Sequence, residues 1–353
     1  MSDKYYDEFN KINIIKLQEF SSKLPDFCFD FFIGIEMRTT PLTRLGYADD
    51  ILLFLNYIIS SKGLDIDTKS LSLDDLKKVT SIEIEHYLSY LSCYSKNGKT
   101  QSNKAQSKSR KLSSIRAFFK YLYEKDLLPQ NVASKVAVPK LHDKPIIRLE
   151  SSEVVKLLNN AESDFKFKTK IQNSYNLNTK DRDIAILTLL LGTGIRVSEL
   201  VGLDLLDIDL DCLSFVVTRK GGNKTILYFT KEIRDAIEIY LPTREYMLEK
   251  AGIQNEYALF LSLQNKRISV RAVQKIVKKH AETVTTLKKI SPHKLRSTFG
   301  TSLYGETKDI YVVAEVLGHK DINTTKRHYA ATSEAIKRAA SKKIKLRPDN
   351  YDE

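Results

Sequence analysis

Two prolines, Pro139 and Pro145, stand between two stretches of helix-forming sequence and divide the chain. Proline disfavours helical backbone in the residue before it, so a segment with two prolines and mixed charges predicts an extended linker at residues 139–149. The chain has 353 residues, which is long enough for two domains with separate cores. The sequence therefore predicts a first domain at 1–138, a second domain at 150–345 and a loose tail at 346–353.

The first domain is expected to be almost entirely helical. Apolar residues recur at helical spacing over residues 41–61. Thr80, with Glu83 three residues later, has the pattern of a capping box and predicts a second helix start. This helix should end before a loop at residues 96–99, and a third helix is expected over residues 103–123.

The helix expected at residues 103–123 combines an apolar face with a basic one. Its basic face carries Lys104, Lys108, Arg110, Lys111 and Arg116. Almost no acid interrupts these cations before Glu124, and serine and glutamine side chains stand among them. Such a face is either solvated surface or a set of phosphate contacts, and we expect it to bind DNA.

The second domain changes character in its middle. Residues 210–218 and 225–230 are rich in β-forming side chains and flank a turn sequence with Gly221, Gly222 and Asn223. This pattern predicts an antiparallel hairpin. Because the surrounding sequence is helical, the expected fold class is mainly α with a small antiparallel β-sheet, so that the second domain is mixed α/β.

The composition indicates which binding partners and which cellular compartment to expect. The formal net charge is +13, which favours a polyanionic partner. The three cysteines are far apart and form no C-x-x-C pair, so neither a disulfide framework nor a structural zinc site is expected. The first residues are polar, and no apolar run approaches the ~18 residues of a membrane span. We therefore expect a cytoplasmic protein without a membrane partner.

Two basic residues occupy special turns in the second domain. Arg196 follows an apolar helix that is broken by Gly192 and Gly194, so a rigid element would hold its side chain near a cleft. Lys220 stands in the turn of the expected hairpin, and a flexible lysine there could donate a proton to a leaving oxygen. Neither glycine-rich segment fits a dinucleotide or ATP-binding loop.

Four more polar residues follow in the last third of the chain. His293 and Arg296 are three apart after Ser-Pro, so both should project from one helical face and bind an anionic oxygen. His319 stands in a turn after Gly318, and Tyr329 should lie early in the next helix. Taken singly, each could be an ordinary surface or packing residue. The combination is more specific.

In their order, these six residues resemble the catalytic set of the tyrosine recombinase family, which includes phage integrases and Xer-like enzymes. The resemblance covers residues 150–340, and the basic helical first domain resembles that family's core-binding domain. It implies Tyr329 as nucleophile, Arg196 and Arg296 as ligands of the scissile phosphate, and Lys220 as general acid. It also implies that His293 and His319 assist at the phosphate and that Glu199 supports Arg196.

The resemblance further implies a site-specific recombinase that cleaves and rejoins DNA through a 3′-phosphotyrosine and a Holliday junction. Its partners would be double-stranded DNA with an inverted-repeat site and three further copies of the chain in a homotetramer. A basic segment at residues 334–344 would dock on a neighbouring subunit. A phosphotyrosine conserves the phosphodiester bond energy, so no metal, ATP or other cofactor is expected. A bacterial protein associated with the nucleoid is implied.

One spacing departs from the family. The nucleophile usually falls about nine residues after the Gly-His turn, but that position is His328 here and Tyr329 is the tenth. We interpret this as a one-residue insertion in the turn. The alternative is a catalytically impaired architectural or regulatory DNA-binding protein on the same scaffold. A type IB topoisomerase and a metal-dependent nuclease fit the sequence less well.

Overall fold

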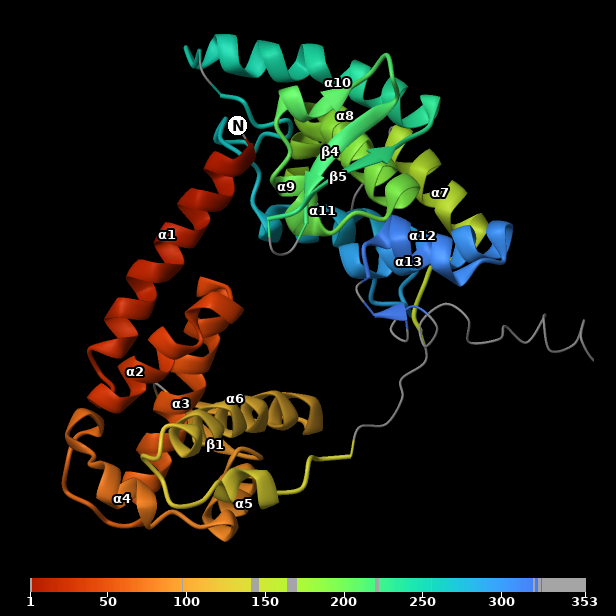
Figure 1. Ribbon diagram of the computed structural model, residues 1–353. Coiled ribbons are helices and arrows are strands. Elements are labelled where there is room, and N and C mark those ends of the chain that lie inside the picture. Colours follow the sequence, from red (N-terminus) through yellow and green to blue (C-terminus); the bar gives the residue numbers. More distant parts are fainter. Residues whose placement is uncertain are drawn as a thin grey trace, which may run out of the picture. The chain divides into compact units, whose positions relative to one another are not determined.

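The structure is a computed structural model that describes residues 2–96, 98–140, 146–163, 170–219, 222–254, 256–319, 321, 322 and 325. Over these ranges the chain is mostly helical with two small antiparallel sheets, which confirms the expected fold class (Figure 1). The chain divides into two compact units, one of residues 4–144 and one of residues 145–353 together with 1–3. Each unit buries apolar side chains of its own.

The first unit is a bundle of helices with one short hairpin. Its α-helices are α1 (Ser2–Ser21), α2 (Asp26–Gly34), α3 (Pro41–Ser61), α4 (Leu73–Lys77), α5 (Ser81–Tyr90) and α6 (Ala105–Glu124). Its short 3-10 helices are η1 (Glu36–Arg38), η2 (Thr68–Ser70) and η3 (Val132–Lys135). The hairpin pairs β1 (Tyr94–Lys96) with β2 (Lys99–Gln101), where the sequence predicted only a loop. Gly98 adopts the left-handed backbone of this tight turn, with φ of 70°.

Local capping explains where these helices begin. The Thr40 side chain accepts a hydrogen bond from the Thr43 amide at 3.3 Å, at the start of α3. Thr80 and Glu83 form the predicted capping box of α5. Helices α3 and α6 then pack against each other around fully buried aromatic side chains such as Phe54 and Phe118.

The second unit combines helices with a three-stranded antiparallel sheet. Its helices are α7 (Ser151–Glu162), α8 (Lys170–Thr193), α9 (Val197–Val201), η4 (Leu205–Asp207), α10 (Lys231–Lys250), α11 (Val270–Ala281), α12 (Pro292–Thr307) and α13 (Ile310–Leu317). The strands are β3 (Ile208–Asp209), β4 (Ser214–Thr218) and β5 (Lys224–Tyr228), in the order β3-β4-β5. The register runs from Ser214 opposite Tyr228 to Thr218 opposite Lys224, which confirms the predicted hairpin.

Helix α8 is the central element of this unit. It packs against α7, α10 and α12 (Figure 1). Its apolar run is fully buried at Ile186, Leu189 and Leu190, as expected from the sequence. Because three neighbouring helices hold α8, its end at Thr193 fixes the start of the turn that carries Arg196.

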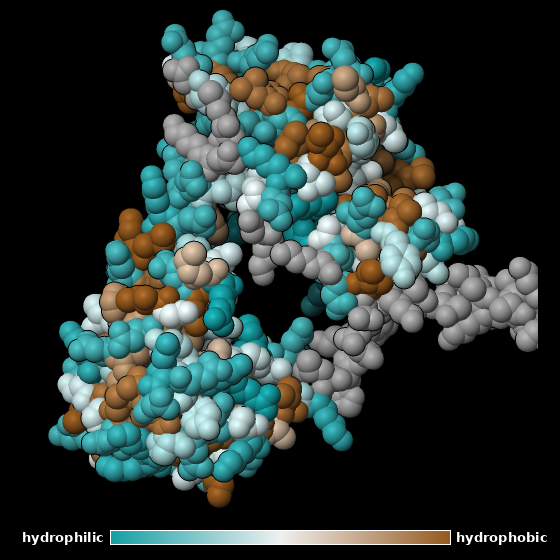
Figure 2. All heavy atoms as spheres, in the orientation of Figure 1, coloured by the Kyte–Doolittle hydropathy of each residue, from teal (hydrophilic) through white to brown (hydrophobic). Residues whose placement is uncertain are grey.

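The surface in view is mostly hydrophilic, with hydrophobic side chains in several separate groups (Figure 2). Single exposed apolar residues such as Leu206 and Leu287 are ordinary in a folded chain. Across the part of the chain that the structure describes, no helix combines the length and apolar character required to cross a bilayer.

Candidate active site

The turn between α8 and α9 holds Arg196 in place. The Arg196 amide donates to Glu199 Oε2 at 2.8 Å, and its guanidinium donates to Glu199 Oε1 at 2.7 Å. A second guanidinium nitrogen donates to the Gly318 carbonyl at 3.1 Å. The Glu199 side chain is only 3% exposed while that of Arg196 is 35% exposed. The buried carboxylate of Glu199 therefore holds Arg196 in position, while the Arg196 side chain still reaches solvent.

Gly194 allows this turn to lie close to α12. Its φ is 61°, and a Cβ at this position would come within 2.3 Å of the Phe299 ring. Any side chain would therefore push the turn away from α12. The close approach lets Arg296 of α12 donate to the Gly194 carbonyl at 2.6 Å.

Arg296 is buried. The sequence predicted that Arg296 and His293, three residues earlier, would project from one helical face. The Arg296 side chain donates to the carbonyls of Gly194 and Leu317, and its residue is 3% exposed. His293 is exposed near the start of the same helix. Of the predicted pair, Arg296 contacts the turn of Arg196 and the end of α13, while His293 is exposed.

The carboxyl end of α13 is where the arginines meet. Arg219, Arg296 and Arg196 donate respectively to the last three carbonyls, those of Val316, Leu317 and Gly318. These carbonyls have no partner within the helix, and the helix dipole makes this end partly negative, so cations are favoured there.

His319 follows this helix end directly. Gly318 closes α13 in the left-handed conformation with φ of 63°, and the His319 amide donates to the Ala314 carbonyl at 2.9 Å. His319 Nδ1 lies 2.8 Å from the hydroxyl of the buried Thr325. This hydrogen bond fixes the orientation of the imidazole ring.

Arg219 is a site residue that sequence reasoning missed. It follows β4, and its guanidinium lies 3.4 Å from Glu199 Oε2, while it donates to the carbonyls of Leu317 at 3.1 Å and Val316 at 2.8 Å. Burial lowers the pKa of Arg219, and the charge of Glu199 opposes that shift. The signal in the sequence was only its position beside Lys220, since a cation in a hairpin turn is common.

Two predicted catalytic residues, Lys220 and Tyr329, lie outside the described residues, as do His328 and the basic segment 334–344. The residues that are described bring Arg196 and Arg219 onto the single carboxylate of Glu199. One carboxylate cannot neutralise two guanidinium groups, so Arg196, Arg219 and Glu199 together carry a net positive charge. Planar guanidinium groups are suited to bidentate contacts with phosphate, and the arrangement is fit to bind a phosphodiester.

The basic helix of the first unit differs from its predicted form. Lys111 lies inside, where its amine is 2.8 Å from a carboxylate oxygen of the fully buried Asp50. Arg110 donates to both oxygens of Asp50 at 2.6 Å, and Ser114 donates at 2.7 Å. A buried carboxylate requires such partners, because desolvation of an unpaired charge is costly. The inward direction of Asp50 on α3 was not visible in the sequence.

The other predicted DNA-binding residues are divided between surface and interior. Lys104 is exposed, and Lys108 donates to the Ser92 hydroxyl at 2.6 Å. Arg116 donates to the backbone carbonyls of Ala133 and Val136, and therefore fastens η3 to α6. The Arg110 side chain remains 56% exposed despite its contact with Asp50. Of the five residues, Lys104 and Arg110 are exposed, Lys108 and Arg116 are half-buried, and Lys111 is buried.

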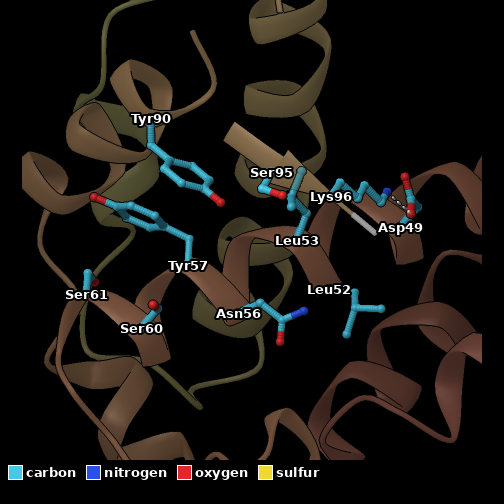
Figure 3. Close-up of a pocket in the computed structure, with 10 residues that line it drawn as sticks. All are labelled: Asp49, Leu52, Leu53, Asn56, Tyr57, Ser60, Ser61, Tyr90, Ser95 and Lys96. Atoms are coloured by element: carbon cyan, nitrogen blue, oxygen red, sulfur yellow. Dashed lines mark hydrogen bonds and ion pairs between the residues drawn. The ribbon is translucent and has the colours of Figure 1, made fainter. Parts of the chain in front are cut away.

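A pocket of about 580 Å³ also opens in the first unit beside α3. Figure 3 shows Tyr57 and Tyr90 on one side of it, with ring centroids 4.9 Å apart, and the Lys96–Asp49 ion pair at 2.7 Å on the other. None of the predicted catalytic residues lines it. Across the described residues, no group of three or more His, Cys, Asp or Glu side chains is placed to hold a metal ion.

Comparison with known proteins decides the family. The sequence profile of the phage integrase family matches residues 148–335, which include all six predicted catalytic positions. The chain belongs to the phage integrase family. The recombinase is therefore an enzyme of the tyrosine recombinase type, which cleaves and rejoins DNA in site-specific recombination, and the non-catalytic alternative is not favoured.

Curated relatives extend the likeness to both units of the recombinase. Tyrosine recombinase XerC of Caldanaerobacter subterraneus is 33% identical over 321 residues, which are 89% of this chain and 84% of the relative. Tyrosine recombinase XerS of Streptococcus thermophilus is 30% identical over 340 residues, which are 88% of this chain and 93% of the relative.

Solved structures share the fold of the recombinase at lower identity. The XerH recombinase bound to a palindromic difH substrate matches with a TM-score of 0.63 and 19% identity, over 86% of this chain and 80% of that one. The Tn1549 transposon integrase in complex with transposon right end DNA matches with a TM-score of 0.61 and 18% identity, over 90% and 98%. Both similarities concern the fold.

Proposed function

We propose that Tyr329 attacks the scissile phosphate and forms a 3′-phosphotyrosine, while Arg196 and Arg296 bind that phosphate. The observation that supports this is the convergence of arginines on the end of α13, directly before His319 and shortly before Tyr329 in the sequence. In the transition state the phosphate gains negative charge, and preorganised cations stabilise it.

Lys220 would donate the proton to the leaving 5′ oxygen, and His319 would hydrogen-bond a phosphate oxygen. The contact between His319 Nδ1 and the Thr325 hydroxyl supports the second role, because it holds the imidazole ring in place next to the end of α13, where the arginines converge. His293 is exposed near the start of α12, where DNA could contact it. The tyrosine ester conserves the energy of the phosphodiester, so religation would require neither ATP nor metal.

The two units would act together on DNA. Residues 1–138 would form the core-binding domain, with Lys104, Lys108 and Arg110 on the phosphate backbone, and residues 150–345 the catalytic domain. Residues 139–149 would be the linker and 346–353 the tail. Four subunits on two inverted-repeat sites would exchange strands through a Holliday junction, in the bacterial cytoplasm at the nucleoid. A λ integrase tetramer on a Holliday junction is among the related structures.

A nicked suicide duplex tests the proposed chemistry. The DNA would carry the site that the protein itself enriches from a random duplex pool, and products would be resolved on a denaturing gel. We expect a covalent protein–DNA band with the wild type and none with Tyr329→Phe. Tyr304→Phe and Tyr311→Phe are matched controls that should retain the band. A band that survives in Tyr329→Phe, or a wild type that binds the site without forming one, would contradict the proposal.

A further inference from the structure

Arg219 links three elements that are far apart in the sequence. It directly follows β4, and its amide donates to the Asn223 carbonyl at 2.7 Å, so its backbone belongs to the hairpin turn. Its guanidinium contacts Glu199 of α9 and the last carbonyls of α13. One side chain therefore ties the hairpin to the turn of Arg196 and to the helix end that precedes His319.

The fit of this side chain is close. The Arg219 side chain is 9% exposed, and a Cβ at Gly318 would lie 2.9 Å from its guanidinium carbon. The guanidinium therefore lies flat against the backbone at the Gly-His turn. A buried cation is costly unless it is paired, and here Glu199 and two carbonyls provide the partners. Such a contact leaves little freedom for the hairpin end.

The residue that follows Arg219 in the chain is Lys220. A general acid must lie within hydrogen-bond distance of the oxygen that it protonates, so its catalytic contribution depends on where its backbone is held. Arg219 is turned inward, as Arg296 is, whereas the side chain of Arg196 is more exposed. Arg219 differs from Arg296 in its place in the chain, because it lies in the hairpin turn directly before Lys220.

We propose that Arg219 is a positioning residue: it holds the β4–β5 hairpin against the end of α13, so that Lys220 reaches the leaving oxygen of the phosphate bound by Arg196. The proposal rests on the proposed function, in which Lys220 is the general acid. It assigns Arg219 an effect on leaving-group protonation rather than on phosphate binding.

Two suicide substrates of the same sequence test this role. One has the normal 5′ oxygen as leaving atom, and the other has sulfur, which leaves without a general acid. Single-turnover cleavage would be measured on both for the wild type, Arg219→Ala and Arg219→Lys. Lys220→Ala and Arg196→Ala are the references for loss of the acid and loss of a phosphate ligand. Because each comparison uses one protein preparation, any inactive fraction cancels in the ratio of the two rates.

We expect Arg219→Ala to cleave the oxygen substrate at least about 10-fold more slowly than the wild type, and the sulfur substrate within about 3-fold of it. This is the pattern expected of Lys220→Ala. Arg219→Lys keeps the charge but lacks the planar fork, so it should lie between the wild type and Arg219→Ala.

Equal slowing of both substrates by Arg219→Ala, as expected for Arg196→Ala, would overturn the proposal, and so would unchanged cleavage of the oxygen substrate. Failure of the proposed function has a different signature. In that case the wild type forms no adduct, or the sulfur substrate does not rescue Lys220→Ala, and the role of Arg219 falls with it.

Discussion

At the scale of single residues, Glu199 is the group on which the arginines of the site depend. It is buried, it accepts hydrogen bonds from the amide and guanidinium of Arg196, and it contacts Arg219. Without its negative charge, two guanidinium groups would remain close together and repel each other. The position of Arg196 therefore depends on a carboxylate that would not itself touch DNA.

Replacing this carboxylate by an amide should slow cleavage. Glu199→Gln keeps the size of the side chain but removes the charge, and its NH₂ group faces guanidinium donors. We expect single-turnover cleavage to fall by at least about 10-fold, which corresponds to about 1.4 kcal/mol of transition-state stabilisation. Glu249→Gln, at an exposed position on α10, is the matched control and should leave the rate unchanged. A Glu199→Gln enzyme with the wild-type rate would contradict this role.

The order of the catalytic residues could be predicted from the sequence, whereas their contacts could not. Arg196, Arg296 and His319 stand in recognisable local patterns of glycine turns and helix starts. Arg219 has no such pattern. Its role depends on carbonyls that are 97 and 98 residues away in the chain, and only the folded unit brings these groups together.

At the scale of elements, helices α3 and α6 of the first unit are joined by a buried ionic cluster. Asp50 of α3 is fully buried and binds Arg110 and Lys111 of α6. The helices themselves were predictable because capping residues and apolar spacing are local signals. The burial of a charged residue was not, because the sequence does not show which polar residue of a helix turns inward.

Removal of this buried carboxylate should destabilise the first unit. Asp50→Asn leaves the Lys111 ammonium buried without its ionic partner, so we expect a loss of about 3 kcal/mol in the free energy of unfolding. Asp49→Asn is a matched control at the preceding residue, where the ion pair with Lys96 is partly exposed, and it should cost less than about 1 kcal/mol. Urea unfolding of the full chain would measure both. If both variants lost the same free energy of unfolding, the buried contacts of Asp50 would not contribute more to stability than the exposed ion pair of Asp49.

A second buried cluster joins α8 to α11 and gives the catalytic unit an acid-sensitive point. Asp183 is 1% exposed and contacts Arg182, Lys279 and His280. Burial by itself would raise the pKa of Asp183, but the hydrogen bond with His280 and the charges of Arg182 and Lys279 outweigh it and lower the pKa to about 2.

This depressed pKa predicts a loss of stability in acid. The stabilising contribution is fully present above the pKa of an unfolded aspartate, about 3.9, and disappears as pH falls through the folded value. We expect a contribution of about 2 kcal/mol to be lost between about pH 4 and pH 2. Urea unfolding at several pH values would measure it, with Asp183→Asn as the comparison. If the two proteins lost the same free energy over that interval, the cluster would not be the cause.

At the scale of the whole molecule, the basic segment near the carboxyl end offers a way to separate binding from assembly. Residues 334–353, which include the basic segment 334–344, lie outside the described residues. Their sequence carries six Lys or Arg and four Asp or Glu. Because this segment adds little net charge, its removal should weaken electrostatic attraction to DNA only slightly.

Deletion of residues 334–353 should therefore reduce recombination and cooperative assembly more than binding to a single half-site. The physical reason is that the segment is proposed to contact a neighbouring subunit rather than DNA. Band-shift titrations on half-sites and full sites would separate the two effects, and a recombination assay on paired sites would complete the series. Equal loss in all three would contradict a role between subunits.

The central claim is that Tyr329 forms the covalent bond to DNA despite its shifted spacing. The most direct measurement is mass spectrometry of the trapped adduct, after nuclease trimming of the DNA and digestion with trypsin. Cleavage after Arg327 gives the peptide 328–337, in which Tyr329 is the one tyrosine, while Tyr304 and Tyr311 fall in the separate peptides 297–308 and 309–320. We predict a nucleotide on peptide 328–337. A nucleotide on either of the other peptides would contradict the account.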